Sequence, residues 1–99
     1  MDGYIYQIKN LVNNKVYIGQ TFNIENRFNT HVQQLKTNTH INPHLQSSFN
    51  KYGMDNFKFS ILLKIDCSDD ELTQLEDYYM LKAGFPDDDK CYNIHSLWC

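Results

Sequence analysis

The first two structural elements are indicated by short runs of β-branched and aromatic residues at positions 4–8 and 16–19. Asn13 and Asn14 lie between these runs, and asparagines in that position are typical of the turn of a β-hairpin. Because successive side chains of a strand point to opposite faces, Tyr17 and Gly19 should share one face of the second strand. Tyr6 of the first strand could lie on that same face, next to Tyr17.

Two helices are predicted after the hairpin. Hydrophobic residues recur at the spacing of one helical face over Ile24–Lys36, and Asn23 suits the N-cap position. A second helix is indicated by Asn42-Pro43, because asparagine can cap a helix and proline is tolerated in its first turn. Gly53 ends this helix.

A third strand and a third helix follow. Hydrophobic residues alternate with other residues over Phe57–Ile65, which predicts a strand, and Ser68-x-x-Glu71 predicts the capping box of a helix that runs to Gly84. Tyr92-Asn93-Ile94 could form a short final strand. This order of elements indicates an α+β fold, a small and mainly antiparallel three-stranded sheet flanked by three helices.

The composition predicts a single domain over residues 1–99. With 41% hydrophobic and 14% aromatic residues, a chain of this length can bury one core. No hydrophobic run approaches the ~20 residues that span a bilayer, and the N-terminus does not have the pattern of a signal peptide. We therefore expect an intracellular, cytoplasmic protein without membrane contact, and three widely spaced cysteines do not predict a disulfide framework.

Charge is distributed unevenly along the chain, although the net charge is only −3. Residues 1–64 carry seven basic and three acidic side chains, whereas residues 65–99 carry two basic and nine acidic ones. Such asymmetry fits a basic face that meets phosphate, with the acidic remainder elsewhere. Charge alone does not identify a nucleic-acid partner, because charged blocks are commonly solvated surface.

Glu76 is the first candidate for a chemical role. On the third predicted helix it falls on one hydrophobic stripe with Leu72, Tyr79 and Ala83. An unpaired carboxylate buried there costs several kcal/mol, so a metal ion or a basic partner should compensate it. The alternative is a carboxylate at the rim of the stripe that pairs with a lysine.

Arg27 and His31 form a second candidate pair. Arg27 is the only arginine in the chain, against eight lysines, which favours a task that needs a planar guanidinium, such as bidentate phosphate binding. Chance is an equal alternative. His31 lies one helical turn later and can point toward the same edge of the sheet, although many histidines in such places are only hydrogen-bonded structural residues.

His40 and His44 have the spacing of half a zinc site. No paired cysteines accompany them, so surface imidazoles on a loop and a helix start are the favoured interpretation.

Together these residues resemble the GIY-YIG nuclease family. Tyr4-Ile5-Tyr6 and Tyr17-Ile18-Gly19 match the two halves of its signature, with ten residues between them. The rest of the match lies in Asn23-x-x-x-Arg27-x-x-x-His31, His40, Gln46-x-x-Phe49-x-x-Tyr52-Gly53, Leu75-Glu76 and Tyr92-Asn93-Ile94. The chain resembles in particular the N-terminal catalytic domains of phage and intron-encoded homing endonucleases. One departure is that Tyr4 replaces the first glycine, with Gly3 displaced by one position.

The resemblance implies a DNA endonuclease that depends on Mg²⁺, for which Mn²⁺ can substitute. It implies that Tyr6 is a general base whose proton His31 relays, and that Tyr17 binds the scissile phosphate. Arg27 would stabilise the developing charge and Glu76 would bind the metal. Gly19 and Asn93 would have structural roles at the site, and His40 would contact substrate.

Lysines are the candidates for contacts with the DNA backbone, above all Lys15, Lys36 and Lys51, with Lys9 and Lys58 in addition. No groove-reading element is recognisable, so we expect a separate DNA-binding region in a longer protein, of which this chain would be the catalytic part. Two other functions stay open: a non-cleaving nucleic-acid-binding module of the same fold and a tyrosine-rich protein-interaction domain.

Overall fold

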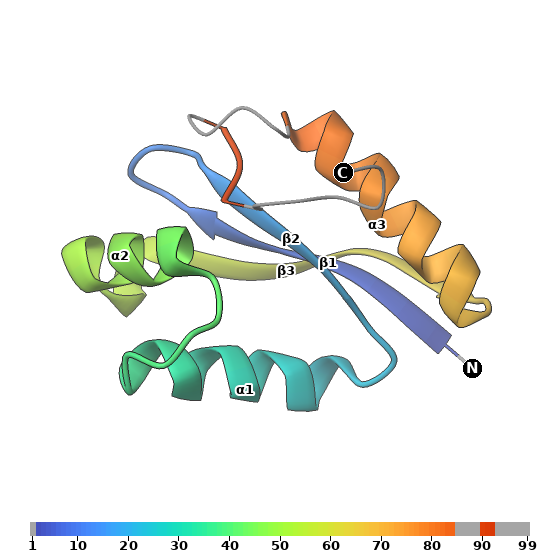
Figure 1. Cartoon of the computed structure of the whole chain (residues 1–99), viewed down its shortest axis with the longest axis horizontal. Coiled ribbons are helices and arrows are strands. Elements are labelled where there is room, and N and C mark those ends of the chain that lie inside the picture. Colours follow the sequence, from blue (N-terminus) through green and yellow to red (C-terminus); the bar gives the residue numbers. More distant parts are fainter. Residues whose placement is uncertain (1, 85–89, 93–99) are drawn as a thin grey trace.

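The order of elements predicted from the sequence is confirmed. A computed structural model describes residues 2–84 and 90–92 of the chain (Figure 1). Its elements are β1 (Asp2–Asn10), β2 (Val16–Thr21), α1 (Ile24–Lys36), α2 (Pro43–Tyr52), the short 3₁₀ helix η1 (Met54–Asn56), β3 (Phe57–Asp66) and α3 (Asp69–Ala83). Only η1 was not predicted.

The helices begin and end at the predicted caps. The side chains of Asn23 and Asn42 accept hydrogen bonds from backbone N–H groups three residues later, at 3.1 and 3.0 Å. Ser68 and Glu71 form the complete capping box of α3, and Gly84 ends that helix in the left-handed conformation. These caps satisfy backbone groups that the first and last helical turns leave without partners.

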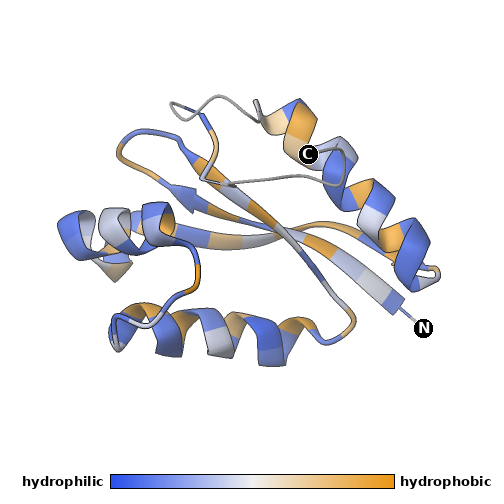
Figure 2. Ribbon diagram, viewed as in Figure 1, coloured by the Kyte–Doolittle hydropathy of each residue, from blue (hydrophilic) through white to orange (hydrophobic). Residues whose placement is uncertain are grey.

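The sheet has the strand order β2-β1-β3, with both pairs antiparallel, and it is covered on both faces. Helix α3 packs on one face, where Ile5, Val16 and Ile18 contact Leu72 and Met80. Helices α1 and α2 cover the other face, and Figure 2 shows α1 with its hydrophobic residues turned toward the sheet. The core of the second face consists of Tyr6, Ile8, Leu35, Leu45, Phe57 and Tyr92.

A β-bulge in β3 changes which face its hydrophobic residues meet. Tyr6 pairs with Ile61 and the preceding Ile5 pairs with Leu63, so that Leu62 is an extra residue in the edge strand. Before the bulge, side chains such as Phe57 pack toward α1 and α2, whereas Leu63 packs toward α3. The bulge therefore lets one strand contribute to both cores.

The expected final strand is present only as a single bridge within the described residues. Tyr92 donates a backbone hydrogen bond to Val16 at 2.7 Å, and Cys91 bridges Val16 in parallel orientation. Asn93 and Ile94 lie outside the described residues. No helix in the described part of the chain has the length and hydrophobicity needed to cross a bilayer.

Candidate active site

Gly19 and Tyr6 are direct partners across the hairpin. A Cβ atom added at Gly19 would overlap with the hydroxyl end of the Tyr6 ring. Glycine at this position therefore leaves the space in which the phenol lies, and Tyr6 is only 2% exposed. Tyr17 packs against the same core as Tyr6, as the alternation of side chains predicted.

Tyr6, His31 and His40 form a continuous chain of hydrogen bonds. The Tyr6 hydroxyl lies 2.6 Å from Nε2 of His31, and Nδ1 of His31 lies 2.7 Å from Nε2 of His40. The ring of Tyr17 meets both imidazoles edge to face, with centroid distances of 5.5 and 6.0 Å. Residues from β1, β2, α1 and the α1–α2 loop thus meet in one cluster.

Burial favours the uncharged forms of the tyrosines and histidines in this cluster. Burial, and after it the neighbouring His40 and Arg27, together lower the pKa of His31 to about 3. Burial likewise lowers the pKa of His40. Burial raises the pKa of Tyr6 far above its usual value, and Arg27 opposes this rise. A phenol in this state needs further stabilisation of its anion before it can accept a proton at neutral pH.

Arg27 lies on the solvent side of this cluster. It is exposed and lines a hollow of about 330 Å³ between the end of β2 and the first turns of α1 and α3. The other lining residues are Gln20, Thr21, Phe22, Asp69, Leu72 and Thr73. A hydrogen bond of 3.1 Å from Gln20 to Thr73 joins β2 to α3 beside this hollow. The guanidinium is therefore available to a ligand from solvent.

Glu76 lies on the buried side of α3 between Leu72 and Met80, as the helical stripe predicted, but it is itself only partly buried. Burial and the adjacent Asp77 raise the pKa of Glu76, Arg27 opposes the rise, and the net result is a pKa of about 7. Burial raises the pKa of Tyr17, and the charge of Glu76 is the next largest cause of that rise. The two groups are therefore electrostatic neighbours. A carboxylate oxygen that burial has made costly to ionise fits a hard divalent cation.

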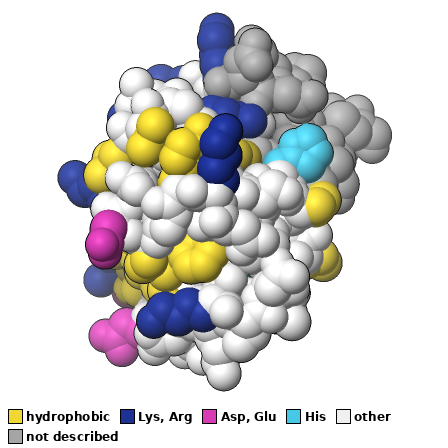
Figure 3. All heavy atoms as spheres, turned by 90° about the vertical axis from the view of Figure 1, so that its left-hand side faces the viewer, with side chains coloured by type: hydrophobic (Ala, Val, Ile, Leu, Met, Phe, Trp, Pro, Cys, Tyr) yellow, Lys and Arg dark blue, Asp and Glu magenta, His cyan; other side chains and the backbone are white. Residues whose placement is uncertain are grey.

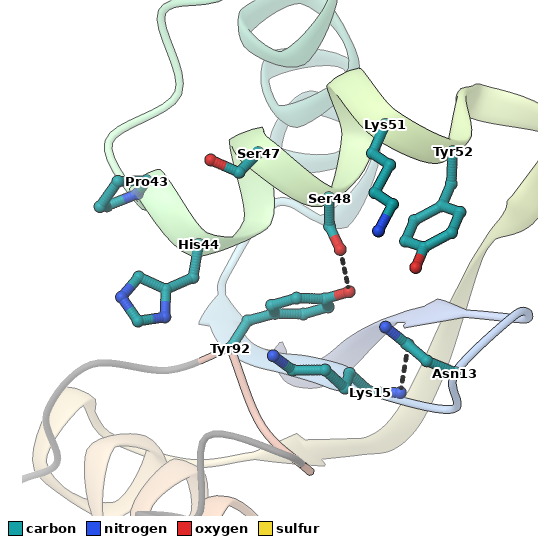
Figure 4. A pocket seen from close by; sticks show the side chains of 9 residues that line it. All are labelled: Asn13, Lys15, Pro43, His44, Ser47, Ser48, Lys51, Tyr52 and Tyr92. Atoms are coloured by element: carbon teal, nitrogen blue, oxygen red, sulfur yellow. Dashed lines mark hydrogen bonds between the residues drawn. The ribbon is translucent and has the colours of Figure 1, made fainter.

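Two of the predicted substrate lysines meet away from the catalytic cluster. Lys15 and Lys51 line a hollow of about 480 Å³ between α2 and the β1–β2 turn, shown in Figure 4. The other lining residues are Asn13, Pro43, His44, Ser47, Ser48, Tyr52 and Tyr92. Figure 3, which shows this end of the molecule, has Lys or Arg side chains spread over the face and acidic ones toward one edge. Lys36 lies elsewhere, in the last turn of α1.

His40 was expected to contact substrate, and the structure places it in the hydrogen-bond chain with His31. His40 is 8% exposed and contacts Nδ1 of His31, the ring nitrogen that does not face Tyr6. His44, in contrast, lines the hollow that contains Lys15 and Lys51. Sequence reasoning also missed Asp77, which is 3% exposed beside Glu76 and has a partner in the structure. An acidic residue directly after a predicted metal ligand was the only available signal for it.

Comparison with known proteins agrees with this arrangement. The family model of the GIY-YIG catalytic domain matches residues 2–88. Intron-associated endonuclease 1 of Enterobacteria phage T4 is 40% identical over 80 residues, which are 81% of this chain and 32% of that protein. Probable intron-encoded endonuclease 1 of Neurospora crassa is 37% identical over 101 residues, covering 96% of this chain and 31% of that protein. The chain thus spans about a third of the length of these relatives.

Solved structures give the same result for the fold. The catalytic domain of homing endonuclease I-TevI has a TM-score of 0.82 and 35% sequence identity, with 95% of this chain and 99% of that chain covered. A mutant of the same catalytic domain has a TM-score of 0.84, with 97% and 96% covered. Family model, relatives and fold agree, and the chain belongs to the GIY-YIG catalytic domain family, as its signature residues predicted.

Proposed function

We propose that the chain is the cleavage domain of a homing-type endonuclease that hydrolyses DNA phosphodiesters with one divalent metal ion, Mg²⁺ or Mn²⁺. The observation that carries the proposal is the contact of 2.6 Å between the Tyr6 hydroxyl and His31. The charges of Arg27 and Glu76 both lie close enough to shift the pKa of Tyr6. The relatives are intron and homing endonucleases by name, which supports the same activity.

Each side chain has a role that its position supports. Tyr6 would take a proton from the attacking water, with His31 as its hydrogen-bonded partner. Tyr17 would donate its hydroxyl to the scissile phosphate, and the exposed Arg27 would stabilise the charge that develops on phosphorus. Glu76 would hold the metal, which when bound neutralises charge on the phosphate and on the leaving oxygen. A Mg²⁺ site with one carboxylate completes its shell with water and phosphate oxygens.

We further propose that residues 1–99 are the catalytic part of a longer protein whose DNA-binding region lies elsewhere in its chain. The support for this is the length of the relatives, of which this chain covers about a third. Recognition of a target sequence would then belong to the other region, and binding by these 99 residues would be weak and nonspecific.

The first experiment measures cleavage of supercoiled plasmid by this chain with Mg²⁺, with Mn²⁺ and with a chelator. Conversion to nicked or linear DNA is expected with either metal and not with the chelator. Tyr6→Phe keeps the ring but removes the hydroxyl, so this variant is the control against a contaminating nuclease. Binding without cleavage would indicate a nucleic-acid-binding module, and neither binding nor cleavage would leave a protein-interaction domain as the better proposal.

The lysine hollow is expected to contact the DNA backbone. Lys15 directly precedes β2 and lies two residues before Tyr17, a spacing of about 7 Å in an extended chain. Its ammonium lies 4.7 Å from the centroid of the Tyr92 ring. Lys51 is likewise held over the ring of Tyr52, at 5.2 Å. Neither lysine has an acidic side chain among the described residues that line the hollow. Both charges are therefore available to phosphates of the DNA backbone.

Lys15→Gln/Lys51→Gln should weaken nonspecific DNA binding and lower the slope of log K against log salt by about 2, because two phosphate contacts are lost. Lys64→Gln/Lys82→Gln removes the same charge elsewhere, from β3 and α3, and should change the slope much less. Binding is measured by fluorescence anisotropy over a range of salt concentrations. Equal effects of the two pairs would show that the hollow has no special contact with DNA.

A further inference from the structure

The backbone N–H of Asn42 determines where the protons of the histidine pair lie. This N–H donates to Nδ1 of His40 at 3.0 Å, so that nitrogen must be unprotonated. A neutral His40 then carries its hydrogen on Nε2, which faces Nδ1 of His31 at 2.7 Å. The opposite tautomer would place the hydrogen of Nδ1 against the hydrogen of the Asn42 amide. The contact with Asn42 therefore makes His40 the donor to His31.

The same reasoning extends from His31 to Tyr6. Because Nδ1 of His31 accepts from His40, a neutral His31 carries its hydrogen on Nε2 and donates it to the Tyr6 hydroxyl oxygen at 2.6 Å. The three hydrogen bonds that link Asn42, His40, His31 and Tyr6 then all run in one direction, from the Asn42 amide to Tyr6. Burial keeps both imidazoles neutral at ordinary pH, since it lowers the pKa of each.

We propose that His40 is a positioning residue, which holds His31 as a fixed hydrogen-bond donor to the Tyr6 oxygen through the Asn42 amide. A donor of this kind stabilises the phenolate form of Tyr6 without itself moving a proton. His31 cannot accept the proton of Tyr6, because the nitrogen that faces Tyr6 is already protonated. The proton that Tyr6 takes from water therefore stays on Tyr6 and does not pass to His31, and a static hydrogen bond replaces the relay through His31 expected from the sequence.

The surroundings of His40 are built to keep this direction. The Asn42 side chain caps α2 through Leu45 and donates to the Tyr92 carbonyl at 2.8 Å, so the Asn42 peptide is fixed at both sides. The backbone N–H of His40 donates to Gln46 at 3.1 Å, and Gln46 in turn donates to the carbonyl of Leu35. His40 and Asn42, the two loop residues in this series of hydrogen bonds, are thus each held by further contacts.

The proposal deepens the proposed nuclease function, and its first test does not depend on cleavage. Long-range ¹H–¹⁵N spectra of imidazole nitrogens distinguish the two neutral tautomers. His31 and His40 are both expected as the Nε2–H form in the wild-type protein. A His31 in the Nδ1–H form would overturn the proposal even if the domain cleaves DNA, and failure to cleave would leave this result valid.

Two variants of His40 test its consequence for catalysis. In His40→Gln the carboxamide oxygen can accept from the Asn42 amide while its nitrogen donates to His31, so His31 should stay in the Nε2–H form and kcat should fall much less than in His40→Leu. His40→Leu removes the donor, so the Nδ1–H form of His31 should become detectable. In that variant kcat on plasmid should fall roughly ten- to hundredfold with little change in KM, as part of the effect of a general base. Equal loss of kcat in both variants, with His31 unchanged, would overturn the proposal in favour of a structural role.

Discussion

Replacing Glu76 with glutamine is expected to abolish plasmid cleavage while the metal-free protein becomes at least as stable as the wild type. The carboxylate lies between Leu72 and Met80 on the buried side of α3, where ionisation is costly without a cation. Glutamine has nearly the same shape but does not provide the charge that a divalent ion needs. Function and stability should therefore change in opposite directions. Plasmid nicking with Mg²⁺ and thermal unfolding in chelator measure the two effects.

The gain in stability should depend on pH. Burial raises the pKa of Glu76 to about 7 in the folded protein, against an ordinary value near 4.5. Between these values the folded state binds a proton that the unfolded chain has released, so the free energy of unfolding of the wild type falls as pH rises. Glu76→Gln has no titrating group at this position, so its free energy of unfolding does not fall with pH for this reason. Its advantage in chelator should be small at about pH 5 and reach roughly 1–2 kcal/mol at about pH 8, allowing for partial exposure.

Glu71→Gln is the matched control for this experiment. It removes the same charge from an exposed position on the first turn of α3, and glutamine can replace glutamate in a capping box. This variant should cleave like the wild type and show no such gain. A marked fall in melting temperature of Glu76→Gln at about pH 8 would instead mean that Glu76 is held by a structural ion pair.

The ends of the helices could be predicted from the sequence because their causes are local. Asn23, Asn42 and Ser68 each bond to a backbone N–H three residues along the chain, so the pattern contains both partners. The partly buried position of Glu76 was predictable for a similar reason, since residues three or four apart share a helical face. Gly84 follows the same logic at the C-terminal end of α3.

The contacts of His40 could not be predicted in this way. Residues 31 and 40 are separated by the end of α1 and a loop, and their hydrogen bond depends on how that loop is held by Gln46 of α2, which bonds to both His40 and Leu35. The bulge at Leu62 was hidden for another reason. An uninterrupted hydrophobic alternation does not show that one residue is skipped by the partner strand. Both features depend on tertiary pairing, which a single sequence does not record.

Gly19→Ala is expected to reduce cleavage by at least about a hundredfold, close to the full contribution of a general base. The new Cβ would occupy the position of the Tyr6 hydroxyl end, and the ring is buried, so Tyr6 must swing away from its 2.6 Å contact with His31. The displaced ring should also lower stability by roughly 1–3 kcal/mol, as in other overpacked cores. Single-turnover cleavage measures the first effect and thermal unfolding the second.

Gly3→Ala separates loss of packing from loss of chemistry. A Cβ at Gly3 would come within 2.9 Å of a Leu72 methyl carbon and 3.1 Å of the Cys67 sulfur, on the α3 side of the same strand β1. This variant should therefore lose stability like Gly19→Ala but keep its cleavage rate at temperatures where it is folded. If both alanine variants lose cleavage equally, overpacking of the sheet is the common cause. If Gly19→Ala cleaves like the wild type, Tyr6 does not need the position in which the structure holds it.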